Sequence, residues 1–232
     1  MPRRFAPLRD GVVSKNGDGP KLRGIVFDMD GTLCEPQTYM FAEMRAALGI
    51  PKSIDILQHI ESLPEPQQAA ATESIRAIER RAMAAQVPQP GLDRLMTYLD
   101  ARAVPKAICT RNFDVPVQNL LTKFLAGSVF HPVVTREFRP PKPHPAGILH
   151  IADSWGLRDQ AGGVDASCLI MVGDSLDDMT AGRKAGAATV LLANHVNRDL
   201  ADHADTDLVV ESLDELVAIL DDGFEGRPLT AE

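Results

Sequence analysis

The sequence has few cysteines, no excess of positive charge and no long apolar run, and each shortage excludes a class of protein. Its three cysteines are scattered and no pair has metal-ligand spacing, so we expect reduced thiols in an intracellular protein. The net charge of −8 argues against a nucleic-acid polymer or an anionic membrane as the main partner. No apolar run is long enough to span a bilayer, and no signal-peptide core is present.

What the sequence does contain suits a globular protein of one large domain, or of a core with a smaller accessory domain. It has 232 residues, of which 44% are hydrophobic. Residues 1–21 are rich in proline, glycine and charge, which predicts a flexible N-terminal extension. We also expect a C-terminal tail over residues 225–232. A cytoplasmic location is expected, with a mitochondrial presequence in the basic N-terminus as the weaker alternative.

Short apolar runs alternate with helical patterns through most of the chain. Strands are expected at 24–28, 107–109, 133–134, 169–172, 190–192 and 208–210. Between these runs, apolar residues recur at helical spacing. Strands that alternate with helices in this way indicate an α/β protein with a doubly wound parallel sheet.

Residues 35–88 interrupt this alternation. They contain no strand pattern, and their apolar residues predict three helices. The stretch from Val87 to Gly91 contains two prolines and a glycine, which marks a boundary. We therefore predict a helical insertion at 35–88, within a core formed by residues 22–34 and 89–224.

The first strand ends in two aspartates. Asp28 and Asp30 follow the apolar run Ile-Val-Phe, and Gly31 predicts that the chain turns there. Ligands of open α/β sheets bind at the carboxyl ends of the strands, and two close carboxylates repel each other unless a cation or a shared proton intervenes. The stretch therefore predicts a metal site or an acid/base pair, with an ordinary Asp-Gly turn as the alternative.

Polar residues also follow other segments expected at this edge of the sheet. They are Thr110, Arg111 and Asn112 after the second core strand, Lys142 in a proline-rich loop, and Asp174, Asp177 and Asp178 after the strand at 169–172. Hard oxygen ligands select Mg²⁺, and a carboxylate can attack phosphorus if the transferred charge is neutralised. This set of side chains therefore fits Mg²⁺-assisted phosphoryl transfer.

The segments DMDGT (28–32), Thr110, Lys142 and GDSLDD (173–178) resemble, in order, the four motifs of the haloacid dehalogenase-like (HAD) hydrolase superfamily. The resemblance spans roughly residues 22–220. It implies a Rossmann-like core and places the insertion at 35–88 where the family has its C1 cap. The Pro90-Gly91 pair before a helix is similar to the second hinge of phosphoglycolate-phosphatase-like members.

The same resemblance implies roles for the catalytic residues. Asp28 would be the nucleophile that forms an aspartyl phosphate, and Asp30 would act first as general acid and then as general base. Thr110 would hydrogen-bond the phosphoryl group, and Lys142 would balance its charge. A hydrolase of phosphate monoesters is therefore the expected enzyme class.

The resemblance also implies a Mg²⁺ site. The carboxylates of Asp28 and Asp174 would bind the ion together with the backbone carbonyl of Asp30. Asp178 corresponds to the second acid of the fourth motif, which supports either the metal or the lysine. Asp177 stands where many relatives have asparagine, so its role is less defined.

The motifs leave alternatives for substrate binding, enzyme class and oligomeric state. Arg111 and Asn112 are candidate substrate-binding residues, although the Arg111 side chain could equally point away. A small phosphorylated metabolite is the expected partner, and the oligomeric state is left open between monomer and dimer. A phosphomutase is the alternative enzyme, disfavoured because residues 36–45 contain no histidine, and a non-catalytic binding protein is the alternative outside enzymes. Asp205 and Asp207 are expected to be solvated.

Overall fold

The computed structural model describes residues 3–9 and 19–227 of the chain. The central element is a six-stranded sheet in the order β4-β3-β2-β5-β6-β7, with every neighbouring pair parallel. Its strands are β2 (Gly24–Phe27), β3 (Lys106–Cys109), β4 (Val133–Val134), β5 (Leu169–Gly173), β6 (Ala188–Leu192) and β7 (Leu208–Val210). This confirms the predicted α/β fold with a Rossmann-like parallel sheet.

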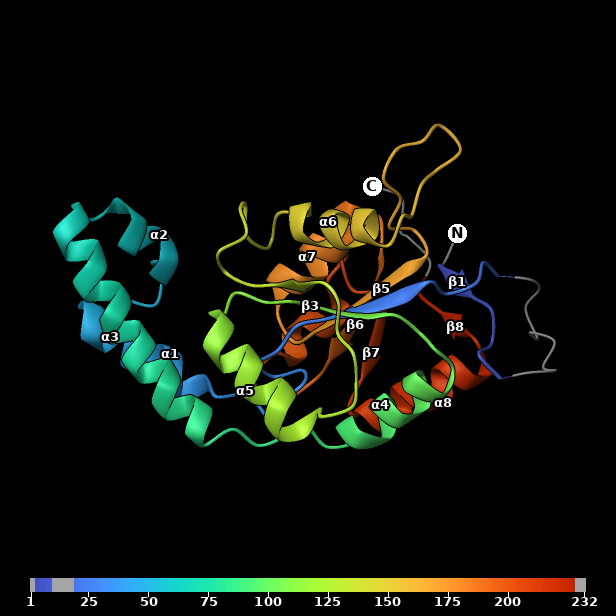
Figure 1. Cartoon of the computed structure of the whole chain (residues 1–232), viewed down its shortest axis with the longest axis horizontal. Coiled ribbons are helices and arrows are strands. Elements are labelled where there is room, and N and C mark those ends of the chain that lie inside the picture. The colour runs from blue at the N-terminus through green and yellow to red at the C-terminus, as the bar shows by residue number, and fades with distance from the viewer. Residues whose placement is uncertain (1–2, 10–18, 228–232) are drawn as a thin grey trace.

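Helices cover both faces of the sheet (Figure 1). They are α4 (Leu92–Ala101), α5 (Asp114–Phe124) and α8 (Leu213–Asp222) on one face, and α6 (Ala146–Ser154) and α7 (Leu176–Ala185) on the other, with a 3₁₀ helix at Arg198–Asp202. Alternate residues of a strand point to opposite faces. In β2, Ile25 and Phe27 pack toward α4 and α8, whereas Val26 packs toward α6. Burial on both faces explains why the strands read as continuous apolar runs.

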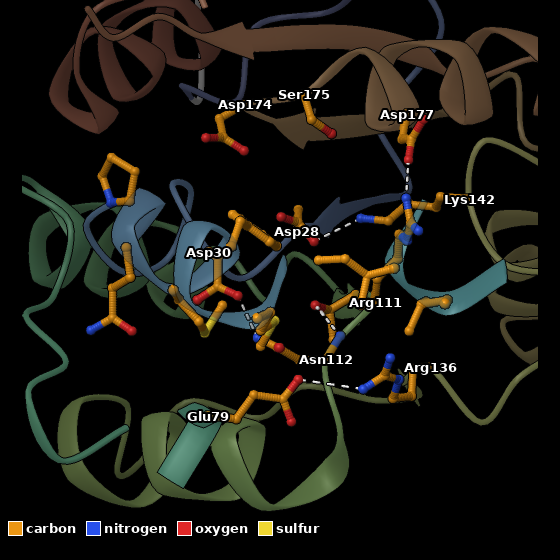
Figure 2. A pocket seen from close by; sticks show the side chains of 18 of the residues that line it. Asp28, Asp30, Glu79, Arg111, Asn112, Arg136, Lys142, Asp174, Ser175 and Asp177 are labelled. Atoms are coloured by element: carbon orange, nitrogen blue, oxygen red, sulfur yellow. Dashed lines mark hydrogen bonds and ion pairs between the residues drawn. The ribbon is translucent and has the colours of Figure 1, made fainter. Parts of the chain in front are cut away.

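The register of the sheet brings the ends of its central strands together. Phe27 at the end of β2 lies beside Ile108 of β3 and Val172 of β5. The backbone N–H of Asp28 then donates to the carbonyl of Val172 at 2.9 Å. The side chains that follow these strand ends consequently gather around one pocket (Figure 2).

The insertion consists of three helices, α1 (Thr38–Leu48), α2 (Ile56–Ser62) and α3 (Glu65–Ala84), as the periodicity predicted. They enclose an apolar cluster of their own, which includes Met40, Met44 and Ile75. Figure 1 shows this cap to one side of the sheet, with α3 next to α5. The two connections to the core pair with each other, since the N–H of Glu35 donates to Val87 at 2.9 Å and that of Gln89 donates to Leu33 at 3.1 Å. No helix within the described residues is both long and apolar enough to cross a membrane.

The prediction of a flexible N-terminal extension is wrong for its first described part. Strand β1 (Arg4–Phe5) pairs antiparallel with β8 (Phe224–Glu225), so the predicted C-terminal tail also begins in a strand. Phe5 is 3% exposed, and its ring centroid lies 5.5 Å from that of Phe224. A strand of two residues is too short to show any periodicity, and its partner is distant in the sequence. Residues 1–2 and 10–18 of the predicted extension lie outside the described residues.

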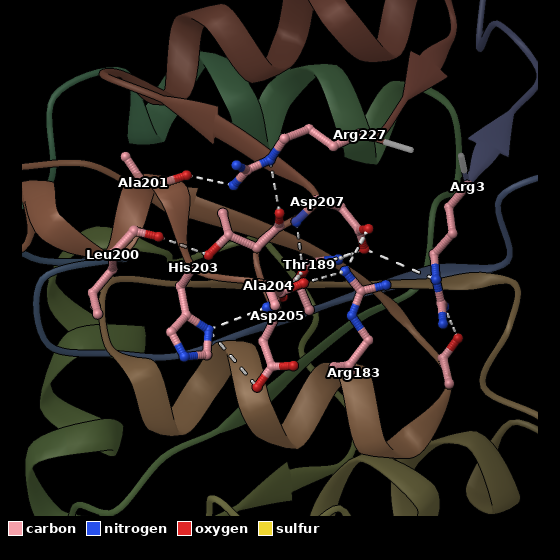
Figure 3. Close-up of polar contacts among 12 residues, drawn as sticks. Arg3, Arg183, Thr189, Leu200, Ala201, His203, Ala204, Asp205, Asp207 and Arg227 are labelled. Carbon is pink, nitrogen blue, oxygen red and sulfur yellow. Dashed lines mark hydrogen bonds and ion pairs between the residues drawn. The ribbon is translucent and has the colours of Figure 1, made fainter. Parts of the chain in front are cut away.

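Asp207 was expected to be solvated and is instead fully buried (Figure 3). Its carboxylate accepts hydrogen bonds from the Thr189 backbone N–H at 2.9 Å and from Arg183 at 2.8 Å. Arg3, beside β1, lies 3.9 Å from the same carboxylate. Asp207 therefore joins β6, α7 and the N-terminal segment, which a reading of local sequence does not reveal because its partners are far along the chain.

Candidate active site

The turn after β2 positions the two aspartates, as the glycine at 31 predicted. The N–H groups of Leu33 and Cys34 both donate to the carbonyl of Met29, at 2.8 and 3.1 Å. Gly31 has a φ of +79°, a conformation that side chains disfavour. A Cβ at this position would also overlap the carboxylate of Asp174. Glycine therefore allows the turn and allows Asp174 to lie against it.

Lys142 connects Asp28, the nucleophile candidate, to the first turn of α7. Its ammonium donates to Asp28 Oδ1 at 2.7 Å and also donates to Asp178 Oδ1. Burial lowers the pKa of Lys142, but the two carboxylates more than offset this and hold the pKa above its usual range. Lys142 is therefore charged at neutral pH, although its side chain is almost entirely buried.

Asp178 is held on both of its oxygens. Its Oδ2 accepts from the backbone N–H of Ser175 at 3.1 Å and from the Ser175 hydroxyl at 2.5 Å, while Oδ1 accepts from Lys142. The Ser175 side chain in turn caps the first turn of α7, so the two residues form a capping box. The geometry favours support of the lysine over direct contact with a metal, which were the two roles that the resemblance implied.

The carboxylates exceed the cations in this part of the pocket. Oxygen atoms of Asp28, Asp174 and Asp178 all lie within 4.8 Å of one another. Burial and the neighbouring acids raise the pKa of Asp174 to about 8. Burial likewise raises the pKa of Asp28 to about 7, and Lys142 opposes that rise. One ammonium does not balance this group together with Asp30, so the donor set fits a divalent cation with hard oxygen ligands.

Asp30 has a different environment from Asp28. One amide N–H of Asn112 donates to Asp30 Oδ2, and the Cys34 thiol lies 3.5 Å from Oδ1. Burial raises the pKa of Asp30, and the hydrogen bond from Asn112 opposes the rise. Asn112, expected to bind substrate, therefore orients this acid, while its backbone N–H donates to the buried Thr110 hydroxyl at 3.2 Å. The two aspartates have separate partners and are suited to separate roles.

Arg111 contacts both sides of the pocket rather than pointing away. Its guanidinium donates to Asp55 Oδ2 at 2.6 Å and also to Asp177. Asp55 belongs to the cap, where its carboxylate accepts from the first backbone N–H groups of α2. Asp177 lies on α7 of the core. Arg111 therefore joins the cap to the core through these two ion pairs, of which the one with Asp177 is drawn in Figure 2.

A cavity of about 290 Å³ lies between the cap and the carboxyl edge of the sheet. It brings together the predicted residues Asp28, Asp30, Thr110, Arg111, Asn112, Lys142 and Asp174. Its cap side is mainly apolar, with Met40, Phe41, Met44 and Ile56 in the wall. Such a volume suits a small molecule whose phosphate lies at the sheet and whose remainder lies under the cap.

The motif geometry agrees with comparison to known proteins. The model of haloacid dehalogenase-like hydrolases matches residues 22–186. The chain belongs to this family. An uncharacterized hydrolase of Saccharomyces cerevisiae, YOR131C, is 45% identical over 205 residues, which cover 86% of this chain and 91% of the yeast protein. A haloacid dehalogenase-like hydrolase domain-containing protein of Arabidopsis thaliana is 34% identical over 223 residues, which cover 90% of this chain and 87% of the Arabidopsis protein.

Solved structures share the fold of this HAD-like hydrolase. A predicted phosphoglycolate phosphatase of Haemophilus somnus superimposes with a TM-score of 0.67 over 85% of this chain and 97% of its own. Its sequence is 20% identical, so the likeness shows the fold alone. The family model and the two sequence relatives confirm the family resemblance recognised from the four motifs.

Two buried residues of this HAD-like hydrolase escaped the sequence analysis. Glu79 on α3 and Arg136 after β4 form an ion pair of 3.4 Å in the cavity wall. The sequence contains an indication of a site role for each of the two residues. Glu79 falls on the apolar stripe of its helix, beside Ile75 and Ala82. Arg136 follows a strand end, as Thr110 does.

Proposed function

We propose that this chain is a Mg²⁺-dependent phosphatase that hydrolyses a small phosphate monoester through an aspartyl phosphate. The observation that carries the proposal is the separation of the two aspartates by their partners. Asp28 lies against the ammonium of Lys142 at 2.7 Å, as a nucleophile facing a negatively charged phosphoryl group requires. Asp30 is oriented by the Asn112 amide, and its desolvation raises its pKa, which favours the protonated form that a general acid needs.

In the first step, a carboxylate oxygen of Asp28 attacks phosphorus, and the bond from phosphorus to the alcohol oxygen breaks. Asp30 donates its proton to that leaving oxygen, so the alcohol departs neutral. In the second step, the Asp30 carboxylate takes a proton from water while the water oxygen attacks the aspartyl phosphate. Inorganic phosphate leaves, and Asp28 regains its carboxylate. Thr110 and Lys142 hold the phosphoryl oxygens during both steps.

Mg²⁺ would be held by the carboxylates of Asp28 and Asp174 and by the backbone carbonyl of Asp30. When bound, it supplies positive charge against the phosphoryl oxygens and the crowded acids. Asp178 acts on the reaction through Lys142, which its Oδ1 holds while Ser175 holds its Oδ2. Gly31 keeps the space in which Asp174 approaches the loop.

The closure of the cap supports a reaction that excludes bulk water. Arg111 holds the N-terminus of α2 to α7 through its two carboxylate partners. The cavity beneath the cap accommodates the leaving group, so its wall selects the substrate. A small phosphorylated metabolite is the substrate class that this volume supports.

The test is phosphate release with and without Mg²⁺ across sugar phosphates, nucleoside monophosphates, phosphoglycolate and an aryl phosphate. We expect metal-dependent release that is lost in Asp28→Asn, since an amide oxygen is a poor nucleophile. The matched control is Asp93→Asn, on the exposed side of α4, which should behave as wild type. Release by Asp28→Asn at the wild-type rate would contradict the mechanism, and an isomerised sugar phosphate without net phosphate would identify a phosphomutase.

A further inference from the structure

The cavity wall contains a buried pair of opposite charges that the proposed reaction does not use. Glu79, on cap helix α3, is 5% exposed, and Arg136, in the core loop after β4, is 7% exposed. Their side chains meet at 3.4 Å, from Arg136 Nη1 to Glu79 Oε1. Both residues line the cavity that contains Asp28 and Asp30. The pair therefore lies where the cap and the core enclose a ligand.

Arg136 is fixed by the loop that carries the catalytic side of the pocket. Its backbone N–H donates to the carbonyl of Asn112 at 2.9 Å. Its guanidinium stacks over the ring of Phe113, 3.8 Å from the centroid. Burial lowers the pKa of Arg136 to about 10, which still leaves it charged at neutral pH. The guanidinium is thus a rigid donor, and it has N–H groups beyond the one that is hydrogen-bonded to Glu79.

Glu79 has an oxygen with no partner. Its Oε1 accepts from Arg136, but its Oε2 is buried and has no hydrogen-bond partner within the described residues. Buried polar atoms are normally paired, and an exception calls for an explanation. A ligand in the cavity can provide the missing donor.

The pair lies on the leaving-group side of the site. Figure 2 shows Glu79 and Arg136 on the opposite side of Asp30 from Asp174 and Asp177. Burial raises the pKa of Glu79 to about 7, and Asp30 is the acid that contributes to the rise. In the proposed reaction Asp30 protonates the leaving oxygen. The atoms bonded beyond that oxygen are therefore the ones that reach Glu79 and Arg136.

The charges at this position favour a neutral, hydroxylated group. Glu79 is already paired with Arg136, so a carboxylate or second phosphate placed there would lie against the Glu79 carboxylate and compete with it for the same guanidinium. A hydroxyl group can accept from an Arg136 N–H and donate to the open oxygen of Glu79. We propose that Glu79 and Arg136 form a hydroxyl-binding subsite, so that the enzyme prefers phosphate esters of sugars or polyols to those of carboxylated alcohols. This inference rests on the phosphatase function proposed above.

The rival arrangement is an anionic leaving group held by Arg45. This residue of α1 also lines the cavity, and it forms no ion pair within the described part of the chain. Its Nε has no hydrogen-bond partner there, and its Nη1 donates to the Phe41 carbonyl at 3.4 Å. If Arg45 selected an anion, carboxylated esters would be the better substrates.

Three esters of equal carbon length separate these possibilities. Glycerol 3-phosphate presents two hydroxyl groups, and 3-phosphoglycerate presents a carboxylate and one hydroxyl group. Propyl phosphate presents neither a hydroxyl group nor a carboxylate. For the wild-type enzyme we expect kcat/KM for glycerol 3-phosphate to exceed that for each of the others by roughly tenfold or more. In Glu79→Gln, the ratio of glycerol 3-phosphate to 3-phosphoglycerate should fall by about tenfold, mainly through KM, because the amide no longer repels the carboxylate.

Ratios within one variant do not depend on the fraction of folded protein. Glu73→Gln is the matched control, since it changes an exposed glutamate on the same helix and should leave the ratio at its wild-type value. A wild-type preference for 3-phosphoglycerate, or an unchanged ratio in Glu79→Gln, would overturn the inference alone. If no ester were hydrolysed, para-nitrophenyl phosphate included, the proposed function would fail and the inference with it.

Discussion

Replacement of Gly31 by alanine tests how closely the first motif is fitted to the metal site. Two effects add at this residue. The φ of +79° costs a residue with a Cβ about 1–2 kcal/mol. The Cβ would also overlap the Asp174 carboxylate, which cannot stay where it is. A displacement of about 1 Å at a reacting group costs roughly 100-fold in rate.

Gly156→Ala separates the two effects. Gly156 has a φ of +68°, and nothing lies within 4 Å of the Cβ that it would gain. Gly156→Ala should therefore lose about 1–2 kcal/mol of unfolding free energy in urea titrations, and Gly31→Ala should lose at least as much because of the added overlap. Only Gly31→Ala should lose kcat/KM, by roughly 100-fold or more, together with Mg²⁺ affinity. If Gly31→Ala were as active as Gly156→Ala, the inferred contact between Gly31 and Asp174 would have no catalytic importance.

Three further predictions concern the cap, the buried pair and the N-terminal strand. Arg111→Gln removes the ion pairs with Asp55 and Asp177. We therefore expect kcat/KM to fall several-fold and limited proteolysis to cut the two cap connections faster. An unchanged rate of proteolysis would show that these ion pairs do not hold the cap. The pKa of Glu79 is raised from 4.5 to about 7, mainly by burial. The folded state therefore keeps a proton that the unfolded chain has lost, and stability should decline as pH rises from about 4.5 to about 7. Thermal melts of Glu79→Gln should lack this part of the decline, and an identical pH profile would contradict it. Phe5→Ala should cost about 3 kcal/mol in urea unfolding, because Phe5 is buried against the core, and a loss below about 1 kcal/mol would show that β1 contributes little.

Much of the core and the centre of the site followed from local sequence. Apolar runs buried on both faces gave the strands, and the polar residues at their ends were Asp28, Thr110 and Asp174. A parallel sheet brings such ends to one edge, so the assembly of these residues required only the strand order. The lysine loop could be placed by the family resemblance, although its contact with Asp28 needed the folded chain.

What escaped the sequence depends on partners that are distant along the chain. Phe5 pairs with β8 across more than 200 residues of sequence, and Asp207 is buried by residues from three segments. Asn112 and Arg111 were recognised as site residues, but the sequence did not indicate where their side chains point. Asn112 is oriented by Asp30, and Arg111 is oriented by its partners in the cap and on α7. Such contacts arise from packing between elements, and no local spacing encodes them.

The most direct test of the mechanism is to trap the covalent intermediate in Asp30→Asn. This variant cannot activate water, and para-nitrophenyl phosphate has a leaving group that needs no protonation. Mixed with Mg²⁺ and this ester, the variant should release about one equivalent of nitrophenolate in a burst and then stop. Peptide mass spectrometry should place the retained phosphoryl group on Asp28. A variant that shows no burst, or a phosphoryl group on another residue, would contradict nucleophilic attack by Asp28.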